Sequence, residues 1–153
     1  MQRIALVAAL AVAAASAGCM AGTMTLPPDF VKVQDRGADS YAVRGISADG
    51  VMVALSRQEN PPNGTLAFWT EAVTNQMVSG RGYKAAGSEP IASAENVPGR
   101  LLTFTTEKQG AAFTYMAAVF VKGNDILIAE AGGRTDVVEP KLADIQKAFR
   151  SVK

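Results

Sequence analysis

The sequence contains no histidine, and this absence excludes several kinds of catalytic and metal site. Ser-His-Asp catalysis, Cys-His catalysis and imidazole-based metal sites all need that residue. The single cysteine, Cys19, excludes an intramolecular disulfide and a multi-cysteine zinc or iron–sulfur site. The 15 Lys and Arg residues are balanced by 14 Asp and Glu, so the chain lacks the basic excess of a dedicated nucleic-acid binder. We therefore expect no metal, no cofactor and no nucleic-acid partner.

The chain also lacks an apolar run long enough to span a membrane. Residues 4–17 are apolar apart from Ser16, and Arg3 precedes them. As a helix this run would rise about 21 Å, which is short of the ~30 Å hydrocarbon core of a bilayer. Its length and its basic start are typical of a secretory signal peptide.

The residues after this run, Ser16-Ala17-Gly18-Cys19, resemble the lipobox of bacterial lipoproteins. In that family signal peptidase cuts before the cysteine, and the thiol carries a diacylglycerol. The alternative is an ordinary secretory signal cut after Ala15 or Ala17. We favour the lipobox because the only cysteine falls at the position where it would be used.

The lipobox resemblance implies a domain organisation and a location. It implies a signal peptide over residues 1–18, lipid attachment with palmitate-type acyl chains at Cys19, a lipidated tether over 19–29 and a single domain over 30–153. Stable anchoring is expected because two or three acyl chains bind a membrane far more firmly than one. Met20 is not the aspartate that retains such proteins in the inner membrane. We therefore expect an outer-membrane location facing the periplasm.

Strand-like and helix-like patterns of apolar residues alternate along the first half of the domain. Residues 30–33, 41–46 and 51–58 are β-prone, and Asp49-Gly50 predicts a tight hairpin turn with both residues at positive φ. Residues 65–79 predict a helix that is capped by Asn63 and ended by Gly80-Arg81-Gly82. Its apolar stripe is Leu66, Trp69, Val73 and Met77. A short strand over 83–86 and an irregular segment over 87–99 follow.

The second half predicts a three-strand meander and a final helix. The strands cover residues 101–107, 111–122 and 125–131, and the last two are apolar on both faces. Pro140 suits the first position of a helix whose apolar positions are Leu142, Ile145, Phe149 and Val152. A sheet covered on both faces by amphipathic helices predicts an α+β fold with three α/β/α layers and a mainly antiparallel sheet.

This order of elements resembles the PsbP-like, Mog-like and DcrB-like fold family. The resemblance covers about residues 26–153, and it rests on Leu26-Pro27-Pro28-Asp29-Phe30 and on the ending Ile145-Gln146-Lys147-Ala148-Phe149-Arg150-Ser151-Val152. The family includes non-catalytic assembly factors, so the resemblance implies a binding or accessory role.

Four residues are candidate contacts for a ligand or partner. Glu130 ends an apolar strand, where its carboxylate could be a buried acid or a ligand contact, or could simply face solvent or pair with a nearby Arg. Arg134 follows Gly132-Gly133, which could hold an anion or form a plain turn. Trp69 and Tyr115 belong to an aromatic set that could line an apolar pocket or form core packing, together with Phe68, Phe113 and Phe120.

Three hypotheses for the function follow from these features. The first is a membrane-anchored envelope lipoprotein with a non-catalytic domain that binds an envelope protein partner. The second is a carrier of a small ligand or lipid with an apolar pocket between helix and sheet. The third is a carboxylate-dependent envelope hydrolase, which would need a second acid facing Glu130. Because no catalytic residue can be named, we expect that the protein is not an enzyme.

Overall fold

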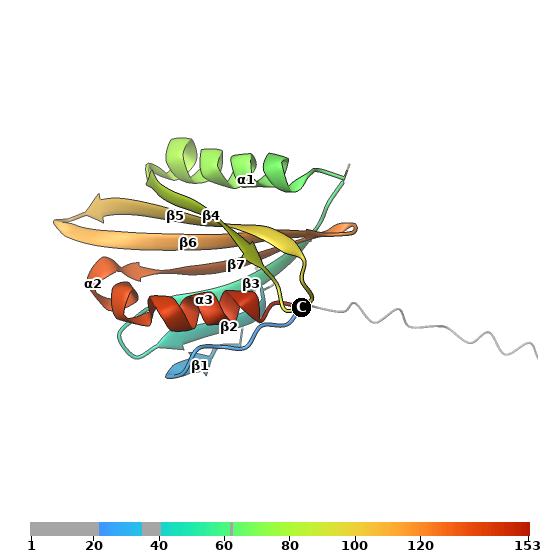
Figure 1. Cartoon of the computed structure of the whole chain (residues 1–153). Helices are drawn as coiled ribbons and strands as arrows, with labels where there is room; N and C mark the ends of the chain where they lie inside the picture. The colour runs from blue at the N-terminus through green and yellow to red at the C-terminus, as the bar shows by residue number, and fades with distance from the viewer. Residues whose placement is uncertain (1–21, 35–40, 62) are drawn as a thin grey trace, which may run out of the picture.

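A seven-stranded antiparallel sheet organises the part of the chain that the computed structural model describes, residues 22–34, 41–61 and 63–153 (Figure 1). In chain order the strands are β1 (Phe30–Lys32), β2 (Tyr41–Ser47), β3 (Met52–Glu59), β4 (Lys84–Ala92), β5 (Pro98–Lys108), β6 (Ala111–Lys122) and β7 (Asp125–Arg134). In space their order is β1-β2-β3-β7-β6-β5-β4, so β7 joins the N-terminal hairpin to the C-terminal meander.

Helical segments lie on both faces of this sheet. On one face, α1 (Leu66–Asn75) runs into a π-helical turn η1 (Gln76–Gly80) and packs over β5 and β6. On the other face lie α2 (Thr135–Val138), the 3₁₀ turn η2 (Glu139–Lys141) and α3 (Leu142–Arg150) (Figure 1). The predicted three-layer α+β architecture is confirmed. Within the described ranges, none of the helices is long and apolar enough to cross a membrane.

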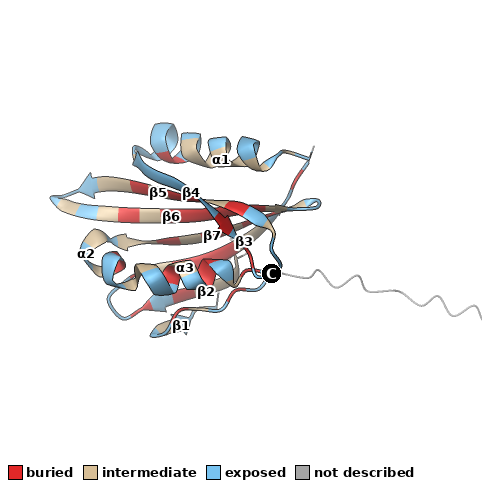
Figure 2. Ribbon diagram, viewed as in Figure 1, coloured by how far each residue is buried: buried red, intermediate tan, exposed pale blue. Residues whose placement is uncertain are grey.

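Two apolar cores lie on opposite faces of the sheet, and β6 contributes to both (Figure 2). Met116, Ala118 and Phe120 point to the core beneath α3. Val119 points to the core beneath α1, where Met77 and Phe104 also lie. The two cores therefore confirm the prediction, made from the apolar residues on both faces of β6 and β7, that the sheet is covered on both sides.

The β2–β3 hairpin forms where it is expected, but its turn differs from the prediction. The Gly50 N–H donates to the Ser47 carbonyl at 3.0 Å, and Gly50 has a φ of +88°. Asp49 does not have positive φ, so the prediction that both turn residues adopt it was wrong. Asp49 instead accepts hydrogen bonds from the Ser47 hydroxyl and, at 2.7 Å, from the Lys141 ammonium group. These two bonds lower the pKa of the Asp49 carboxyl.

The N-cap of α1 is Thr65, so the prediction of Asn63 was wrong. The Thr65 hydroxyl accepts the Phe68 N–H at 3.2 Å, whereas Asn63 has a φ of +65°. The loop before the helix is organised by Asn60, which is buried. The predicted end of the helix is confirmed, because Gly82 has a φ of +72° and the Tyr83 N–H donates to the Met77 carbonyl at 3.0 Å.

The segment 87–99, expected to be irregular, is largely strand. Residues 87–92 belong to β4, and Pro98-Gly99 begin β5. The prediction failed because β4 is an edge strand, where Pro90 interrupts no ladder on its outer side and polar residues face solvent.

Two further boundaries differ near the end of the chain. β7 continues to Arg134, so Glu130 lies inside a strand and Gly132-Gly133 form no turn. The glycines fit a close-packed position, since a Cβ on Gly133 would lie 3.3 Å from both Val138 and Val51. The helical segment starts at Thr135, ahead of the predicted first position Pro140, which lies in η2.

The folded domain begins earlier than the predicted boundary at residue 30. Thr23 and Lys153 exchange backbone hydrogen bonds of 3.1 and 3.0 Å, and the Thr25 N–H donates to the Ser151 hydroxyl at 2.8 Å. Met24 is buried in the core beneath α3. Residues 22–29 are therefore part of the domain and do not form a free tether. The predicted signal peptide and Cys19 lie outside the described residues.

Candidate functional site

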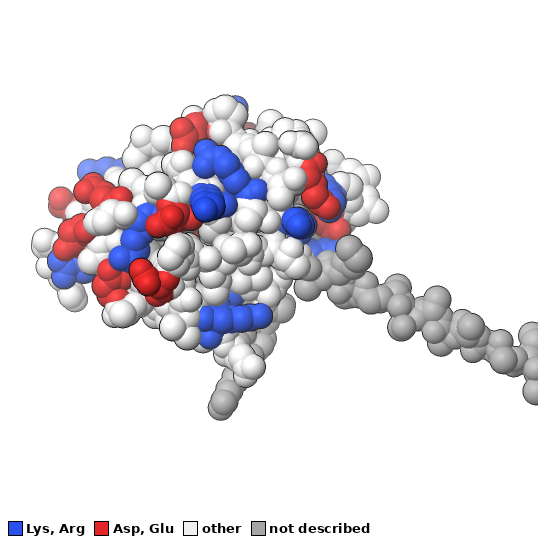
Figure 3. Space-filling model, turned by 60° about the horizontal axis from the view of Figure 1, so that its bottom comes forward, with Lys and Arg blue, Asp and Glu red and all other residues white. Residues whose placement is uncertain are grey.

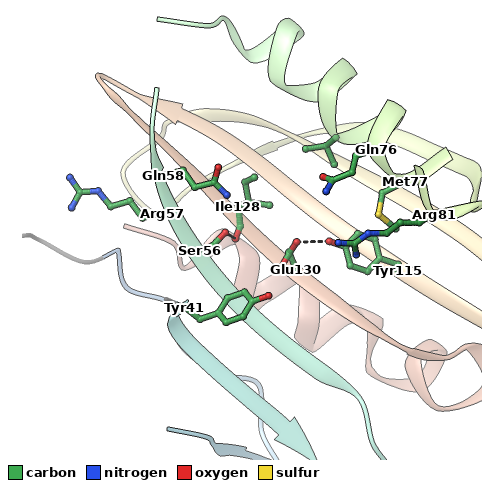
Figure 4. Close-up of a pocket in the computed structure, with 11 residues that line it drawn as sticks. Tyr41, Ser56, Arg57, Gln58, Gln76, Met77, Arg81, Tyr115, Ile128 and Glu130 are labelled. Atoms are coloured by element: carbon green, nitrogen blue, oxygen red, sulfur yellow. Dashed lines mark hydrogen bonds between the residues drawn. The ribbon is translucent and has the colours of Figure 1, made fainter. Parts of the chain in front are cut away.

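A groove of about 350 Å³ lies on the α1 side of the sheet, beside the helix (Figure 4). Its floor comes from β3, β7 and β6, and its rim from the end of α1 and the turn η1. The lining side chains are mostly polar or charged and include Tyr41, Ser56, Gln58, Gln76, Met77, Arg81, Tyr115, Ile128 and Glu130. The groove exists because α1 covers β5 and β6, while no described helix packs over β2 and β3 on this face.

Tyr115 and Glu130 meet at the centre of the groove. The β6–β7 register pairs Tyr115 with Gly132 and Ala117 with Glu130, so the two side chains are diagonal neighbours on one face. The Tyr115 hydroxyl donates to Glu130 Oε1 at 2.5 Å (Figure 4). Burial, followed by the Glu130 carboxylate, raises the pKa of the Tyr115 phenol well above its usual value. Tyr115 thus stays a neutral donor that fixes one carboxylate oxygen.

Arg81 supplies a cation to the same groove. Arg81 directly follows η1. Its positive charge is close enough to Tyr115 to lower the pKa of the phenol, which partly offsets the rise caused by burial and by Glu130. Among the described residues Arg81 forms no side-chain hydrogen bond or ion pair. The guanidinium and the second Glu130 oxygen are therefore available to an incoming molecule.

An apolar row runs from the edge of the sheet into this groove. The strand register places Val31 opposite Ile46, Ile46 opposite Met52, Met52 opposite Gly132 and Gly132 opposite Tyr115. Val31 is 70% exposed and Ile46 is 44% exposed. We call Val31, Ile46 and Met52 the apolar row. Its members are unusual because large apolar side chains on open sheet faces are normally covered.

Of the four predicted contact residues, the structure brings two together. Tyr115 and Glu130 share the groove, as described above. Trp69 lies on the sheet-facing side of α1, where its indole N–H donates to Asn60 Oδ1 at 2.7 Å. Arg134 lies elsewhere, where it forms an exposed two-bond ion pair with Asp136 at 2.6 and 3.1 Å. Trp69 and Arg134 therefore lie outside the groove, and their role as contact residues stays a prediction.

The predicted aromatic set does not line one pocket. Trp69 and Tyr115 pack on the α1 face, whereas Phe120 is buried in the opposite core. Phe68 is 57% exposed and contacts Trp69 edge-to-face, with 5.1 Å between the ring centroids. The sheet separates these rings, because alternate residues of a strand point to opposite faces.

Sequence reasoning missed Arg81 as a site residue. It was assigned only to the helix end, between two glycines. A signal was present, however, because Arg81 lies four residues after Met77 and so continues the apolar stripe that faces the sheet. The diagonal contact of Tyr115 with Glu130 could also be predicted from the sequence, because the tight turn after Lys122 fixes the register of β6 and β7.

The chemistry of the groove suits binding. Glu130 is the one acidic side chain among its described lining residues, so these provide no pair of carboxylates for acid–base hydrolysis. The Ser56 hydroxyl donates to the Ile128 carbonyl at 3.5 Å, and within the described part of the chain no hydrogen bond joins it to the Glu130 carboxylate. Across the described residues, no three Asp, Glu or Cys side chains gather as a metal site would require. Among the residues that the structure describes, the groove offers the Arg81 cation without an ion pair, one half-satisfied carboxylate and several amides and hydroxyls.

Solved structures of distant sequence share this fold. Cyanobacterial PsbP (CyanoP) from Synechocystis sp. PCC 6803 is 13% identical with a TM-score of 0.65, over 87% of this chain and 86% of that one. LpqN of Mycobacterium tuberculosis, involved in cell envelope biogenesis, is 13% identical with a TM-score of 0.57, over 86% and 83%. PA94 of Pseudomonas aeruginosa, a protein of unknown function, is 11% identical with a TM-score of 0.57, over 79% and 78%.

The sequence matches no protein-family profile and no curated protein sequence. The structural likeness therefore defines the class of fold. The domain has an α+β, PsbP-like fold, as the sequence predicted.

Proposed function

We propose that the protein is a bacterial envelope lipoprotein, anchored through Cys19 to the outer membrane and facing the periplasm. Its folded domain binds a protein partner and performs no catalysis. The Ser16-Ala17-Gly18-Cys19 motif supports the anchor. The likeness of the fold to LpqN, a protein involved in cell envelope biogenesis, supports an envelope role. The lack of histidine and of a paired acid in the groove supports a binding role.

The observation that carries the binding role is the groove beside α1 with its adjoining apolar row. Arg81 makes no ion pair with the described residues, and Glu130 is held by Tyr115 with one oxygen unused. On the same sheet face lie two exposed aliphatic side chains, Ile46 and Val31. They are three and four strands from Tyr115, roughly 14 and 19 Å at the ~4.8 Å spacing of neighbouring strands. Charged and apolar groups on one open surface are typical of protein interfaces, in which Arg and Tyr are enriched.

These groups define the chemistry of the partner. A carboxylate on the partner meets the Arg81 guanidinium in a two-bond ion pair, and an N–H or O–H group donates to Glu130. An aliphatic side chain of the partner covers Ile46 and Val31. A partner surface with an acidic residue and, roughly 15–20 Å from it, an aliphatic one satisfies both parts of this face.

The carrier hypothesis has less support from the geometry. The space between α1 and the sheet is filled by Met77, Leu102, Phe104, Val119 and Ile126, with Trp69 and Val73 packed against them. The groove lies beside this packing and is lined mainly by polar side chains. An apolar ligand would find no apolar chamber in the described part of this face.

Site-specific photo-crosslinking in the native host tests the binding role. A photo-reactive residue in place of Gln76, which lines the groove and is exposed, should give a discrete crosslinked product with an envelope protein. Arg81→Glu and Ile46→Glu should reduce that product at least several-fold, because each puts a new negative charge where the partner brings a carboxylate or an aliphatic group.

Two matched variants control for charge reversal and for lost surface hydrophobicity. Arg150→Glu reverses the charge of an exposed side chain on α3, which lies on the opposite face of the sheet. Val78→Glu replaces a side chain that is 39% exposed, close to the 44% of Ile46, but that does not line the groove. A product that Arg150→Glu and Val78→Glu reduce as strongly as the groove variants would contradict the assignment of the partner site to the groove.

A further inference from the structure

The domain holds its N-terminal segment tightly from residue 22 onward. A Cβ on buried Gly22 would lie only 3.0 Å from the Leu127 side chain, which shows how closely the backbone packs at that point. Thr23 and Lys153 pair through two backbone hydrogen bonds, and Met24 is buried. The point at which the chain leaves the domain is therefore fixed beside Lys153.

The distance available between this point and a lipid on Cys19 is small. Three peptide units separate Cys19 from Gly22, and they span at most about 11 Å when fully extended. The headgroup layer of one leaflet takes up about 5–8 Å of that reach. The remaining few ångströms are less than the diameter of one α-helix, about 10 Å. The domain must therefore lie in contact with the bilayer surface.

The groups around Lys153 identify one end of the domain. The Ala94 N–H donates to the Val152 carbonyl at 3.1 Å, which brings the β4–β5 turn, residues 93–97, to this end. The Lys122 ammonium group bonds to Glu95, which adds the β6–β7 turn, residues 122–125. Figure 1 shows both turns at the end where the C-terminus lies, with the β5–β6 turn at the opposite end.

We propose that this end, formed by residues 93–97, residues 122–125 and Lys153, is the membrane-facing surface of the protein and contacts the lipid headgroups. The proposal rests on the proposed anchoring at Cys19 and deepens it by assigning the side that faces the bilayer. The short distance between Cys19 and Gly22 enforces the orientation, with no need for a basic patch. The charges of the two turns are paired with other protein groups, Lys122 with Glu95 and Asp125 with Arg57. Over the face shown in Figure 3, basic and acidic side chains are interspersed.

This orientation has a consequence for the groove. The Lys108 ammonium group lies 5.7 Å from the centre of the Tyr83 ring, which places the chain just after Arg81 near the β5–β6 turn. Arg81 is therefore at the end of the groove that points away from the bilayer. A periplasmic partner can reach it without competing with lipid headgroups.

Fluorescence quenching on vesicles tests the orientation. The chain starting at Cys19 is coupled through its thiol to a maleimide lipid in phosphatidylcholine vesicles that carry a nitroxide on a fraction of the headgroups. A fluorophore is attached through an azide-bearing residue in place of Asn96 in one sample and Gln109 in another. The two positions are matched, since both are exposed turn residues with positive φ, 60° and 53°. β6 has 12 residues, so the two ends of the sheet are roughly 40 Å apart.

We expect the probe at position 96 to be quenched several-fold more strongly than the probe at position 109. Insertion of about ten Gly and Ser residues between Ala21 and Gly22 adds a reach of roughly 17 Å and should abolish most of the difference. Equal quenching at the two positions, stronger quenching at position 109, or a difference that the insertion leaves unchanged would each overturn the proposal.

The chemical coupling separates this inference from the proposed anchoring. Intact mass of the native protein tests lipidation at Cys19 independently. A native protein without lipid would overturn the anchoring proposal and, with it, the orientation in the cell. A lipidated native protein whose coupled form shows equal quenching at both positions would overturn the orientation alone. Circular dichroism of the coupled samples verifies that each remains folded.

Discussion

The indole Nε1 of Trp69 donates a hydrogen bond to Oδ1 of Asn60 at 2.7 Å, and this contact fixes the loop before α1 to the helix. The same amide oxygen accepts the Gly64 N–H at 2.8 Å, and the amide nitrogen donates to the Gly64 carbonyl at 2.9 Å. Asn60 is 3% exposed, so these bonds replace contacts with water. One buried side chain thus determines where the helix beside the groove begins.

Asn60→Ala should lower the free energy of unfolding by about 3 kcal/mol, because it leaves the Trp69 indole N–H and the Gly64 amide without the partner that the buried Asn60 side chain supplies. Urea unfolding followed by circular dichroism measures the loss. Asn124→Ala is the control, since Asn124 contributes only its backbone carbonyl to Asn60, at 2.8 Å. Its effect should stay below about 0.5 kcal/mol. Equal losses in the two variants would contradict the role of the Asn60 side chain.

Tyr115 predicts a specific loss of stability at alkaline pH. Its pKa is raised in the folded state, so above about pH 10 the unfolded chain ionises this phenol while the folded chain does not. The stability contribution is complete below the unfolded pKa of about 10 and falls as the pH rises beyond it, by about 1 kcal/mol near pH 11. Urea unfolding at about pH 8 and pH 11 should show this loss in the wild type and a smaller loss in Tyr115→Phe. An identical alkaline loss in both proteins would contradict the burial of Tyr115.

Met24 tests whether the N-terminal segment belongs to the domain. Its side chain is buried in the core beneath α3, so Met24→Ala should cost about 2 kcal/mol of unfolding free energy. Met52 lies on the partly exposed apolar row, and Met52→Ala should cost less than about 1 kcal/mol. Denaturant unfolding of the chain from Cys19 compares the two. If Met24→Ala were as mild as Met52→Ala, residues 22–29 would be a free tether after all.

Gly99 should tolerate no side chain, although it lies in a strand. A Cβ there would lie 2.5 Å from Phe120 Cδ1 and 2.6 Å from the Val119 carbonyl oxygen. Gly99→Ala should therefore cost about 2–3 kcal/mol through overpacking of the core beneath α3. Gly87 in β4 is the matched strand glycine, with its nearest contact at 3.8 Å, and Gly87→Ala should be neutral or slightly stabilising. Thermal unfolding of the two variants, followed by circular dichroism, should separate them clearly. Equal melting temperatures would contradict the close packing at Gly99.

The sequence predicted those parts of the fold whose apolar periodicity is strong. The stripe from Leu66 to Met77 and the two apolar faces of β6 define both cores, because burial of such residues dominates the stability of these elements. The PsbP-like architecture followed from their order. The sequence-based prediction failed for β4. Its polar residues and Pro90 carry no strand signal, and the segment becomes a strand only by pairing with β5.

The candidate site was only partly predictable, for a related reason. Tyr115 and Glu130 stood out because they interrupt apolar strands, and their contact depends on a register that the β6–β7 turn fixes. Arg81 acquires its position in the groove only because α1 docks over β5 and β6 and leaves β3 and β7 uncovered on this face. The docking of the N-terminal segment on Lys153 was likewise invisible, since hydrogen bonds between residues so distant in sequence leave no periodic pattern.

Anchoring through Cys19 is the central claim of this account, because both the location and the orientation of the domain depend on it. The most direct test is the intact mass of the native protein extracted from membranes. The account predicts a chain that starts at Cys19 and carries the added mass of acyl chains, and it predicts that Cys19→Ala abolishes both the added mass and the membrane fraction. A chain that starts at Ser16 or Gly18 with no added mass would contradict it.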